Sequence, residues 1–297
     1  MVHFLNINSG PGKKLQAGKI PPKLLSNLLN KVEIRDPRVV LGPKIGEDAA
    51  LINVGDKYLV SKMDPITFAT DLIGWYTVQI NANDIAAMGG TPRWLMVTLL
   101  MPEGTTPETV EEIFDQILDS CMSLNITLVG GHTEVTYELT RPLAIGAMLG
   151  EVEKDKPVFT SGAKPGDSII LTKGIAIEGT AILAREASHD LELAGITPHV
   201  LKKAKDFLFS PGISIVPDSS IICEASEVHS MHDPTEGGLA TGLLEIARAS
   251  GVGIVINMNA IPILPESRKI CEALNIDPLG LIASGALLAS VPKQNVP

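Results

Sequence analysis

The sequence predicts an α/β (α+β) protein built from two domains. The chain has 297 residues, enough for two domains of ordinary size. Apolar runs of strand length alternate along it with longer helical segments. A polar connector at residues 151–165 contains Lys, Asp, Pro and Gly and separates two such series. We therefore predict one domain at residues 1–155 and a second at residues 156–297.

In the first half, residues 1–20 are rich in Gly, Lys and Asn, and we expect them to be loosely ordered. Pro21-Pro22 precede a helix at residues 23–31 with leucines on one face. Gly89-Gly90 suit the end of a long apolar helix, and Thr106-Pro107 suit the start of the next. The expected elements, in order, are strands 49–54 and 58–63, helix 73–88, strand 94–100, helix 106–124, a buried strand 126–129 and strand 142–149.

The second half begins with an apolar strand at residues 168–172. Its clearest helix spans residues 237–250, where leucine, isoleucine and alanine fill one stripe and Gly251-Val252-Gly253 follow. The other expected elements are helices 178–187, 200–207 and 219–225, strand 254–257 and a final apolar strand within 281–291.

Composition excludes several classes of protein. The formal net charge of −10 argues against broad binding to nucleic acid or an anionic membrane. The three cysteines lie far apart, which disfavours a zinc site or a disulfide framework, and we expect Cys223 and Cys271 to be buried, reduced thiols. No signal peptide and no uninterrupted apolar run of membrane length is present, so we expect a cytoplasmic protein.

Four aspartates lie at the ends of apolar elements or inside them. Asp48 precedes a strand, Asp64 ends one, Asp84 lies inside an apolar helix and Asp233 precedes a helix. Carboxylates with phosphate oxygens are the ligands that Mg²⁺ prefers. Taken singly, Asp48 also fits a turn, Asp233 an N-cap and Asp84 a satisfied surface group. Asp84 is the hardest to explain in this way, because a buried carboxylate needs partners.

Two glycine pairs suggest contacts with phosphate. Gly130-Gly131 follow an expected strand, and Gly237-Gly238 open an expected helix, where backbone N–H groups favour an anion. Turns use the same residues, and neither a P-loop nor a Gly-x-Gly-x-x-Gly motif is present. His132 has no second ligand at metal spacing, so it fits a hydrogen-bonded turn or a phosphate contact.

In order along the chain, these motifs resemble the aminoimidazole ribonucleotide synthase (PurM-like) superfamily. The superfamily includes thiamine-monophosphate kinase, selenophosphate synthetase and the hydrogenase-maturation factor HypE, and the chain looks most like the HypE branch. The resemblance covers residues 24–297. The motifs that carry it are Gly46-Glu47-Asp48-Ala49-Ala50, Lys62-Met63-Asp64, residues 83–90, Gly130-Gly131-His132-Thr133 and residues 233–240.

The resemblance implies a two-domain PurM-like fold whose N-terminal domain contributes to the β-barrel of a homodimer. It implies an ATP-dependent enzyme that binds ATP and Mg²⁺ and activates an oxygen of its acceptor. The implied metal ligands are Asp48, Asp64 and Asp84. We expect Asp84, Asp233 and His132 to be the catalytic residues. The implied nucleotide-binding residues are Asp48, Asn83, Gly130, Gly131, Thr133, Thr235, Gly237 and Gly238.

Three features depart from the HypE pattern. Residues 291–297 contain no cysteine to carry a carbamoyl group, and we expect the second domain to be truncated relative to the family. His132 stands where an acid is usual, and Glu134 where HypE has a lysine. We therefore expect a HypE-like enzyme with an unknown small-molecule or protein acceptor, connected to hydrogenase maturation. The alternatives are a thiamine-monophosphate-kinase-like phosphotransferase and a non-catalytic nucleotide-binding paralogue.

Overall fold

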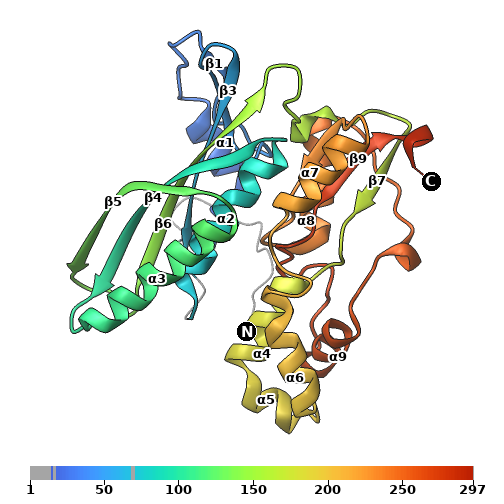
Figure 1. Cartoon of the computed structure of the whole chain (residues 1–297). Coiled ribbons are helices and arrows are strands. Elements are labelled where there is room, and N and C mark those ends of the chain that lie inside the picture. The colour runs from blue at the N-terminus through green and yellow to red at the C-terminus, as the bar shows by residue number, and fades with distance from the viewer. Residues whose placement is uncertain (1–14, 16–17, 68–70, 297) are drawn as a thin grey trace.

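The computed structural model describes Leu15, residues 18–67 and residues 71–296. One lobe is built around a large sheet and the other around a small sheet with several helices, and helix α2 lies between the two (Figure 1). The loose order expected of residues 1–20 concerns a segment that lies mostly outside the described residues. The predicted boundary at residue 155 stays a prediction.

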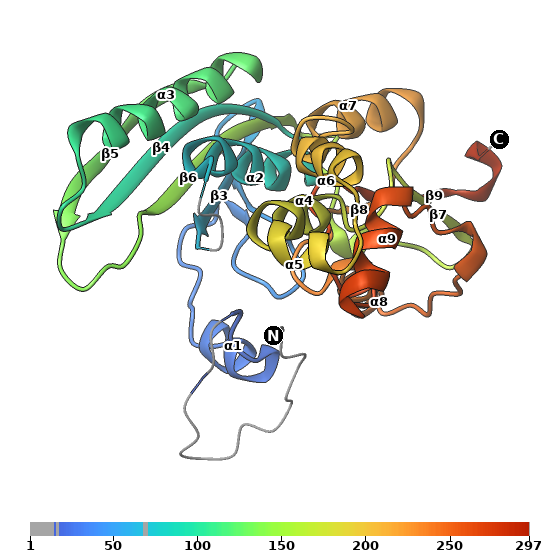
Figure 2. The same ribbon diagram turned by 90° about the horizontal axis from the view of Figure 1, so that it is seen from below.

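A six-stranded sheet forms the first lobe, in the order β1-β2-β3-β6-β4-β5. Neighbouring strands are antiparallel except for β4 and β5, which are parallel and are joined by the crossover helix α3. Helices α2 and α3 lie on one side of the sheet (Figure 2). The bounds are α1 Pro22–Leu29, β1 Val39–Leu41, β2 Ala50–Asn53, β3 Lys57–Ile66, α2 Ile73–Ala87, β4 Thr91–Pro102, α3 Pro107–Ser123, β5 Thr127–Thr136 and β6 Leu143–Glu153.

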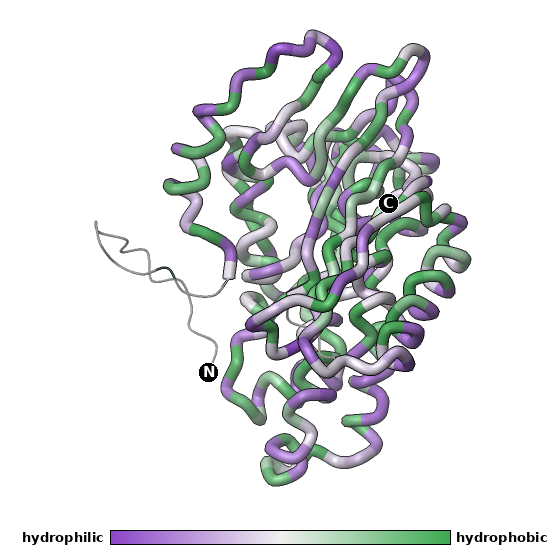
Figure 3. Tube along the Cα trace, turned by 90° about the vertical axis from the view of Figure 1, so that its left-hand side faces the viewer, coloured by the Kyte–Doolittle hydropathy of each residue, from purple (hydrophilic) through white to green (hydrophobic). Residues whose placement is uncertain are grey.

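Side chains on this sheet alternate between a helix-covered face and an open face, as the period of a strand requires. Along β6 the even-numbered residues from 144 to 152 are buried, and the odd-numbered ones are partly exposed. The open face is apolar, since Met63 on β3 is 64% exposed and Met96 on β4 is 39% exposed. Hydrophobic stretches along the strands are visible in Figure 3.

The second lobe contains a three-stranded antiparallel sheet in the order β7-β9-β8. Helices α7 and α8 lie beside it, and α4, α5, α6 and α9 form a cluster at one end (Figure 1). In the described part of the chain, no helix has the length and apolar character needed to cross a membrane. The bounds are β7 Asp167–Leu171, α4 Ile177–Glu186, α5 Ser188–Leu193, α6 Pro198–Lys205, α7 Val216–Ala225, β8 Ser230–His232, α8 Gly238–Ser250, α9 Pro265–Leu274 and β9 Leu288–Pro292.

Helix α2 is buried along almost its whole circumference, with 13 of its 15 residues buried, which explains why it lacks an amphipathic pattern. It is fixed to the second lobe by hydrogen bonds. Asn83 Nδ2 donates to the Ile213 carbonyl at 2.8 Å, and Asn83 Oδ1 accepts from the Ile215 N–H at 2.9 Å. Ser219 Oγ donates to the Ala86 carbonyl at 2.6 Å.

Three expectations about the fold are wrong. The strand expected to be buried at residues 126–129 is part of β5, a sheet edge that pairs on one side only and is largely exposed. Residues 254–257 form no strand, and Val255 is fully exposed. Cys223 is exposed on α7, whereas Cys271 on α9 is buried as expected.

Candidate functional site

The four aspartates singled out in the sequence lie together around one lysine. Lys62 Nζ is 3.2 Å from Asp84 Oδ1 and 3.5 Å from Asp64 Oδ2. Strand alternation places Lys62 and Asp64 on the face of β3 that meets α2, which carries Asp84. Asp48, before β2, and Asp233, after β8, are close enough for their charges to act on Lys62. We call these five residues the acid cluster.

His232 joins the two lobes at the edge of this cluster. Its Nδ1 is 2.9 Å from Asp48 Oδ1, and its Nε2 is 2.8 Å from Glu245 Oε2 on α8. Burial alone would lower the pKa of His232, but the charge of Asp48 and the hydrogen bonds to both carboxylates raise it well above its ordinary value. Thr160 Oγ1 also donates to Asp48 Oδ2, at 3.2 Å. Asp48 is therefore held by two donors.

Two carboxylate oxygens in the acid cluster have no hydrogen-bond partner among the described residues. They are Oδ2 of Asp84 and Oδ2 of Asp233, whose residues are 5% and 2% exposed. Burial raises the pKa of Asp84 well above its usual range, despite the nearby charge of Lys62. Burial, followed by the charge of Asp48, raises the pKa of Asp233 to about 7. Buried polar atoms without partners are typical of catalytic groups and of positions that a water molecule or an ion fills.

The donor set fits a hard divalent cation. Asp48, His232 and Asp233 place ligand atoms within 4.8 Å of one another. Both ring nitrogens of His232 already contact carboxylates, however, so the histidine offers no nitrogen to a metal. The remaining donors are carboxylate oxygens, which Mg²⁺ prefers over nitrogen and sulfur.

Thr235, Gly237 and Gly238 lie in the segment that leads from Asp233 into α8. Both glycines have left-handed backbones, with φ of 81° and 63°. A Cβ atom at Gly238 would lie 2.5 Å from the Leu281 carbonyl oxygen, so this close approach requires glycine. Helix α8 begins here, and its amino end carries the partial positive charge that favours an anion.

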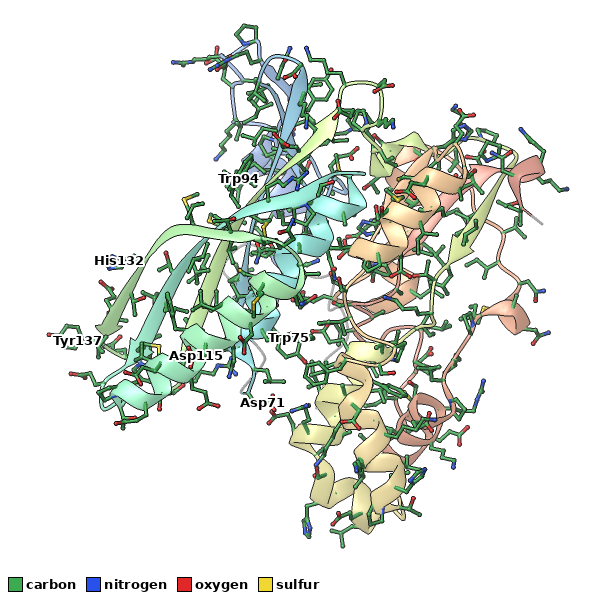
Figure 4. The ribbon with its side chains drawn as sticks, viewed as in Figure 1. Asp71, Trp75, Trp94, Asp115, His132 and Tyr137 are labelled. Carbon is green, nitrogen blue, oxygen red and sulfur yellow. The ribbon has the colours of Figure 1, made fainter. Side chains whose placement is uncertain are left out.

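The other glycine motif lies elsewhere. Gly130, Gly131, His132 and Thr133 belong to the exposed strand β5, and Figure 4 shows His132 at the outer side of the sheet, away from the second lobe. The His132 side chain is 64% exposed and contacts Glu134 at 2.9 Å. The structure therefore does not bring these residues to the acid cluster of the same chain.

The packing of β5 against β4 explains why residue 131 is a glycine. A Cβ atom there would lie 1.9 Å from the Val97 carbonyl oxygen on β4, so only glycine allows this close strand contact. Asn83, another predicted nucleotide contact, uses both polar groups of its side chain to bind the backbone of the second lobe.

Sequence reasoning missed the cationic residues of the site. Lys62 lies two residues before Asp64, and strand alternation alone would have put the two side chains on one face. His232 directly precedes Asp233, but nothing local in the sequence connects it with Asp48, 184 residues away.

Comparison with known proteins identifies the family. The sequence-family model for the AIR synthase related protein, N-terminal domain, matches residues 46–152 of this chain. The sequence-family model for the AIR synthase related protein, C-terminal domain, matches residues 164–297. This chain belongs to the AIR synthase related family. The PurM-like resemblance of the sequence motifs is thereby confirmed.

Named relatives include several enzymes. A Methanocaldococcus jannaschii protein assigned to hydrogenase expression/formation is 30% identical over 287 residues, covering 94% of this chain and 81% of that protein. Carbamoyl dehydratase HypE of Cupriavidus necator is 30% identical over 245 residues, covering 81% of this chain and 65% of the enzyme. Thiamine-monophosphate kinase of Pyrococcus horikoshii is 30% identical over 268 residues, covering 85% of this chain and 78% of the kinase.

Solved structures share the fold. AaThiL in complex with AMPPCP and TMP matches with a TM-score of 0.74 at 20% identity, covering 93% of this chain and 85% of that one. HypE in complex with ATP matches with a TM-score of 0.69 at 22% identity, covering 97% and 81%. The mixed α/β, two-domain PurM-like architecture expected from the sequence is confirmed.

Proposed function

We propose that this protein is a HypE-like, ATP-dependent enzyme that transfers a phosphoryl group to an oxygen atom of a small molecule or a modified protein. The observation that carries the proposal is the pair of buried, unpartnered oxygens on Asp84 and Asp233. A buried polar atom without a partner costs about 1–3 kcal/mol, and a bound cation would remove that cost. A magnesium ion bound to a nucleoside triphosphate has the positive charge and the preference for oxygen ligands that these carboxylates require.

Each residue of the site has a proposed role. Asp48, Asp64 and Asp84 hold the metal, and Asp233 faces them from the second lobe. Bound Mg²⁺ would supply charge neutralisation at the phosphates. Thr235 and the two glycines at the amino end of α8 contact the phosphate oxygens through the loop and its N–H groups. Asp84 and Asp233 are the proposed catalytic carboxylates, because each has a buried oxygen without a partner among the described residues that could contact the metal or the acceptor.

A homodimer is part of the proposal. The edge strand β5 has one unpaired side, and the open face of the sheet is apolar at Met63 and Met96. Exposed apolar surface on a sheet is typical of an interface. We propose that a second copy covers this face and that residues 130–133 act at the partner's nucleotide, and their role in binding and catalysis depends on that arrangement. We also propose a cytoplasmic location.

The acceptor oxygen, by resemblance, belongs to an amide, a carbamoyl group or a phosphate. The hydrogenase-related relative from M. jannaschii, which aligns with 94% of the chain, favours HypE-like chemistry. The P. horikoshii kinase, with equal identity, favours the alternative of phosphate as the acceptor. A paralogue that binds nucleotide without turnover is the third candidate.

Calorimetric titration with ATP, with and without Mg²⁺, tests the site. Wild type is expected to bind ATP in a Mg²⁺-dependent manner, and Asp84→Asn is expected to weaken binding by at least about tenfold, or ~1.4 kcal/mol. Asp115→Asn, an exposed aspartate on α3, is the matched control and should bind like wild type. Absence of Mg-ATP binding by the wild-type protein would refute the proposal.

Turnover separates the three candidates. ADP formation is measured with primary amides, carbamoyl compounds and phosphate monoesters as acceptors. Stimulation by amides or carbamoyl compounds favours the HypE-like reaction, and stimulation by a phosphate monoester favours the kinase. Tight Mg-ATP binding without ADP formation for any acceptor favours the non-catalytic paralogue.

A further inference from the structure

Lys62 occupies an unusual position for a lysine. Its ammonium group lies among four aspartates, 3.2 Å from Asp84 Oδ1 and 3.5 Å from Asp64 Oδ2. These contacts leave some carboxylate oxygens of the cluster unpaired, since Oδ2 of Asp84 and Oδ2 of Asp233 have no hydrogen-bond partner among the described residues. Lys62, together with His232, therefore supplies positive charge that offsets the carboxylates of the site.

A metal ion and this ammonium group would compete for the same carboxylates. Mg²⁺ binds carboxylate oxygens at about 2.0–2.1 Å and demands near-octahedral geometry. A cation bound to the oxygens of Asp84 and Asp233 that lack a partner among the described residues would share the Asp84 carboxylate with Lys62 Nζ, and the two positive charges would repel each other. Occupation by the metal would therefore favour movement of the ammonium group away from Asp84.

The side chain has room to leave. Lys62 retains 23% exposure of its side chain, and its four-carbon stem is flexible. A lysine that only anchored the fold would have no further role after displacement. In a site that binds a triphosphate, however, the displaced ammonium would be beside phosphate oxygens, which lysine binds as a point charge.

We propose that Lys62 is a resident counter-cation of the acid cluster, which Mg²⁺ displaces, and that the displaced ammonium group then contacts a phosphate of the nucleotide. The first step, displacement of Lys62, concerns the metal alone. The second step, contact with a phosphate, rests on the proposed function, and the two steps are measured separately.

The test compares Lys62→Met with Lys57→Met. Lys57 lies on the same strand and has similar ion pairs, at 3.2 Å to Glu151 and 3.5 Å to Glu153, but these are away from the acid cluster. Titration with Mg²⁺ or Mn²⁺ in the absence of nucleotide should show metal affinity about tenfold higher in Lys62→Met than in wild type. Lys57→Met should match wild type. Equal or weaker metal affinity in Lys62→Met would overturn the first step.

Thermal unfolding provides a second measurement. In EDTA, Lys62→Met should melt several degrees below wild type, because its carboxylates repel one another, and saturating Mg²⁺ should restore most of the difference. A lysine with only a structural role would leave the variant equally destabilised with and without Mg²⁺, which would also overturn the first step.

Nucleotide binding tests the second step. At saturating Mg²⁺, Lys62→Met should bind ATP about tenfold more weakly than wild type, and Lys62→Arg should retain most of the affinity. Unchanged ATP affinity in Lys62→Met would overturn the phosphate contact. If wild type binds the metal but no ATP, the proposed function fails while the metal titrations still decide the first step.

Wild-type protein gives an answer even if Lys62→Met does not fold. Acetic anhydride labelling of lysines, followed by mass spectrometry, reports whether Lys62 is accessible. Mg²⁺ alone should increase labelling of Lys62 relative to EDTA and leave Lys57 unchanged. Labelling of Lys62 that does not respond to Mg²⁺ would contradict displacement.

Discussion

The contribution of Glu178 to the pH dependence of the free energy of unfolding can be measured without any ligand. It lies in the first turn of α4, is 5% exposed, and its Oε2 has no hydrogen-bond partner among the described residues. Burial raises its pKa from 4.5 to about 7, although hydrogen bonding to Ser284 opposes the shift. The folded protein therefore holds this proton to a higher pH than the unfolded chain does.

The expected effect follows from that difference in pKa. Between pH 4.5 and 7 the folded state binds more protons at Glu178, so this group stabilises the fold fully at low pH and the contribution is lost as the pH rises through about 7. The difference between a pKa of 4.5 in the unfolded chain and about 7 in the fold, at about 1.36 kcal/mol per pH unit, corresponds to a loss of about 3 kcal/mol. Glu178→Gln has no proton to lose and escapes this loss.

Urea unfolding in EDTA at pH values from 4 to 8 measures the effect. The free energy of unfolding of Glu178→Gln minus that of wild type should increase by about 3 kcal/mol across this range. Other titrating groups cancel in the difference. Glu112→Gln, an exposed change on α3, should give a difference that does not vary with pH. A pH-independent difference for Glu178→Gln would refute the reasoning, because the carboxyl group would then have an ordinary pKa in the fold.

Two further substitutions test the ion pairs of His232 and the packing of β5 against β4. His232→Ala should cost about 3–5 kcal/mol of stability in urea unfolding, because it leaves buried carboxylates without their cation, and an effect below 1 kcal/mol would contradict this role. Gly131→Ala should lower stability by at least about 1–3 kcal/mol, since its Cβ atom would lie 1.9 Å from the Val97 carbonyl oxygen. Gly130→Ala, whose Cβ atom would meet only Met96 at 3.9 Å, is the matched control, and equal Tm values for the two alanine variants would contradict the packing argument.

Local sequence signals predicted most helices of this fold, although α5 and α9 were not among the expected elements. Thr106 caps α3 by accepting a hydrogen bond from the Thr109 N–H, and the apolar stripe of α8 ends at Ser250 before a left-handed Gly251. The edge position of β5 was not predictable, because it depends on which strands pair across long stretches of sequence. An apolar segment reads as a buried strand whether its second side is paired or open.

The acidic residues of the candidate site could be singled out from the sequence, whereas its cationic residues could not. Carboxylates at the ends of apolar elements stand out in a sequence, since they interrupt an apolar pattern. Lys62 and His232 do not stand out, because their importance comes from contacts with Asp84 and Asp48 on other elements. The structure brings together the four acids of the motifs, whereas Gly130 and Gly131 lie on a strand at the outer side of the sheet.

The division of the acid cluster between the two lobes connects binding with the arrangement of the whole chain. Asp84 comes from the first lobe and Asp233 from the second, so a metal that contacts both would hold the lobes together. The Asp48–His232 ion pair already makes such a connection at 2.9 Å without a metal. The hydrogen bonds of Asn83 fix α2 against the second lobe in the same position. A ligand would therefore meet carboxylates that are already in place, which reduces the ordering cost of binding.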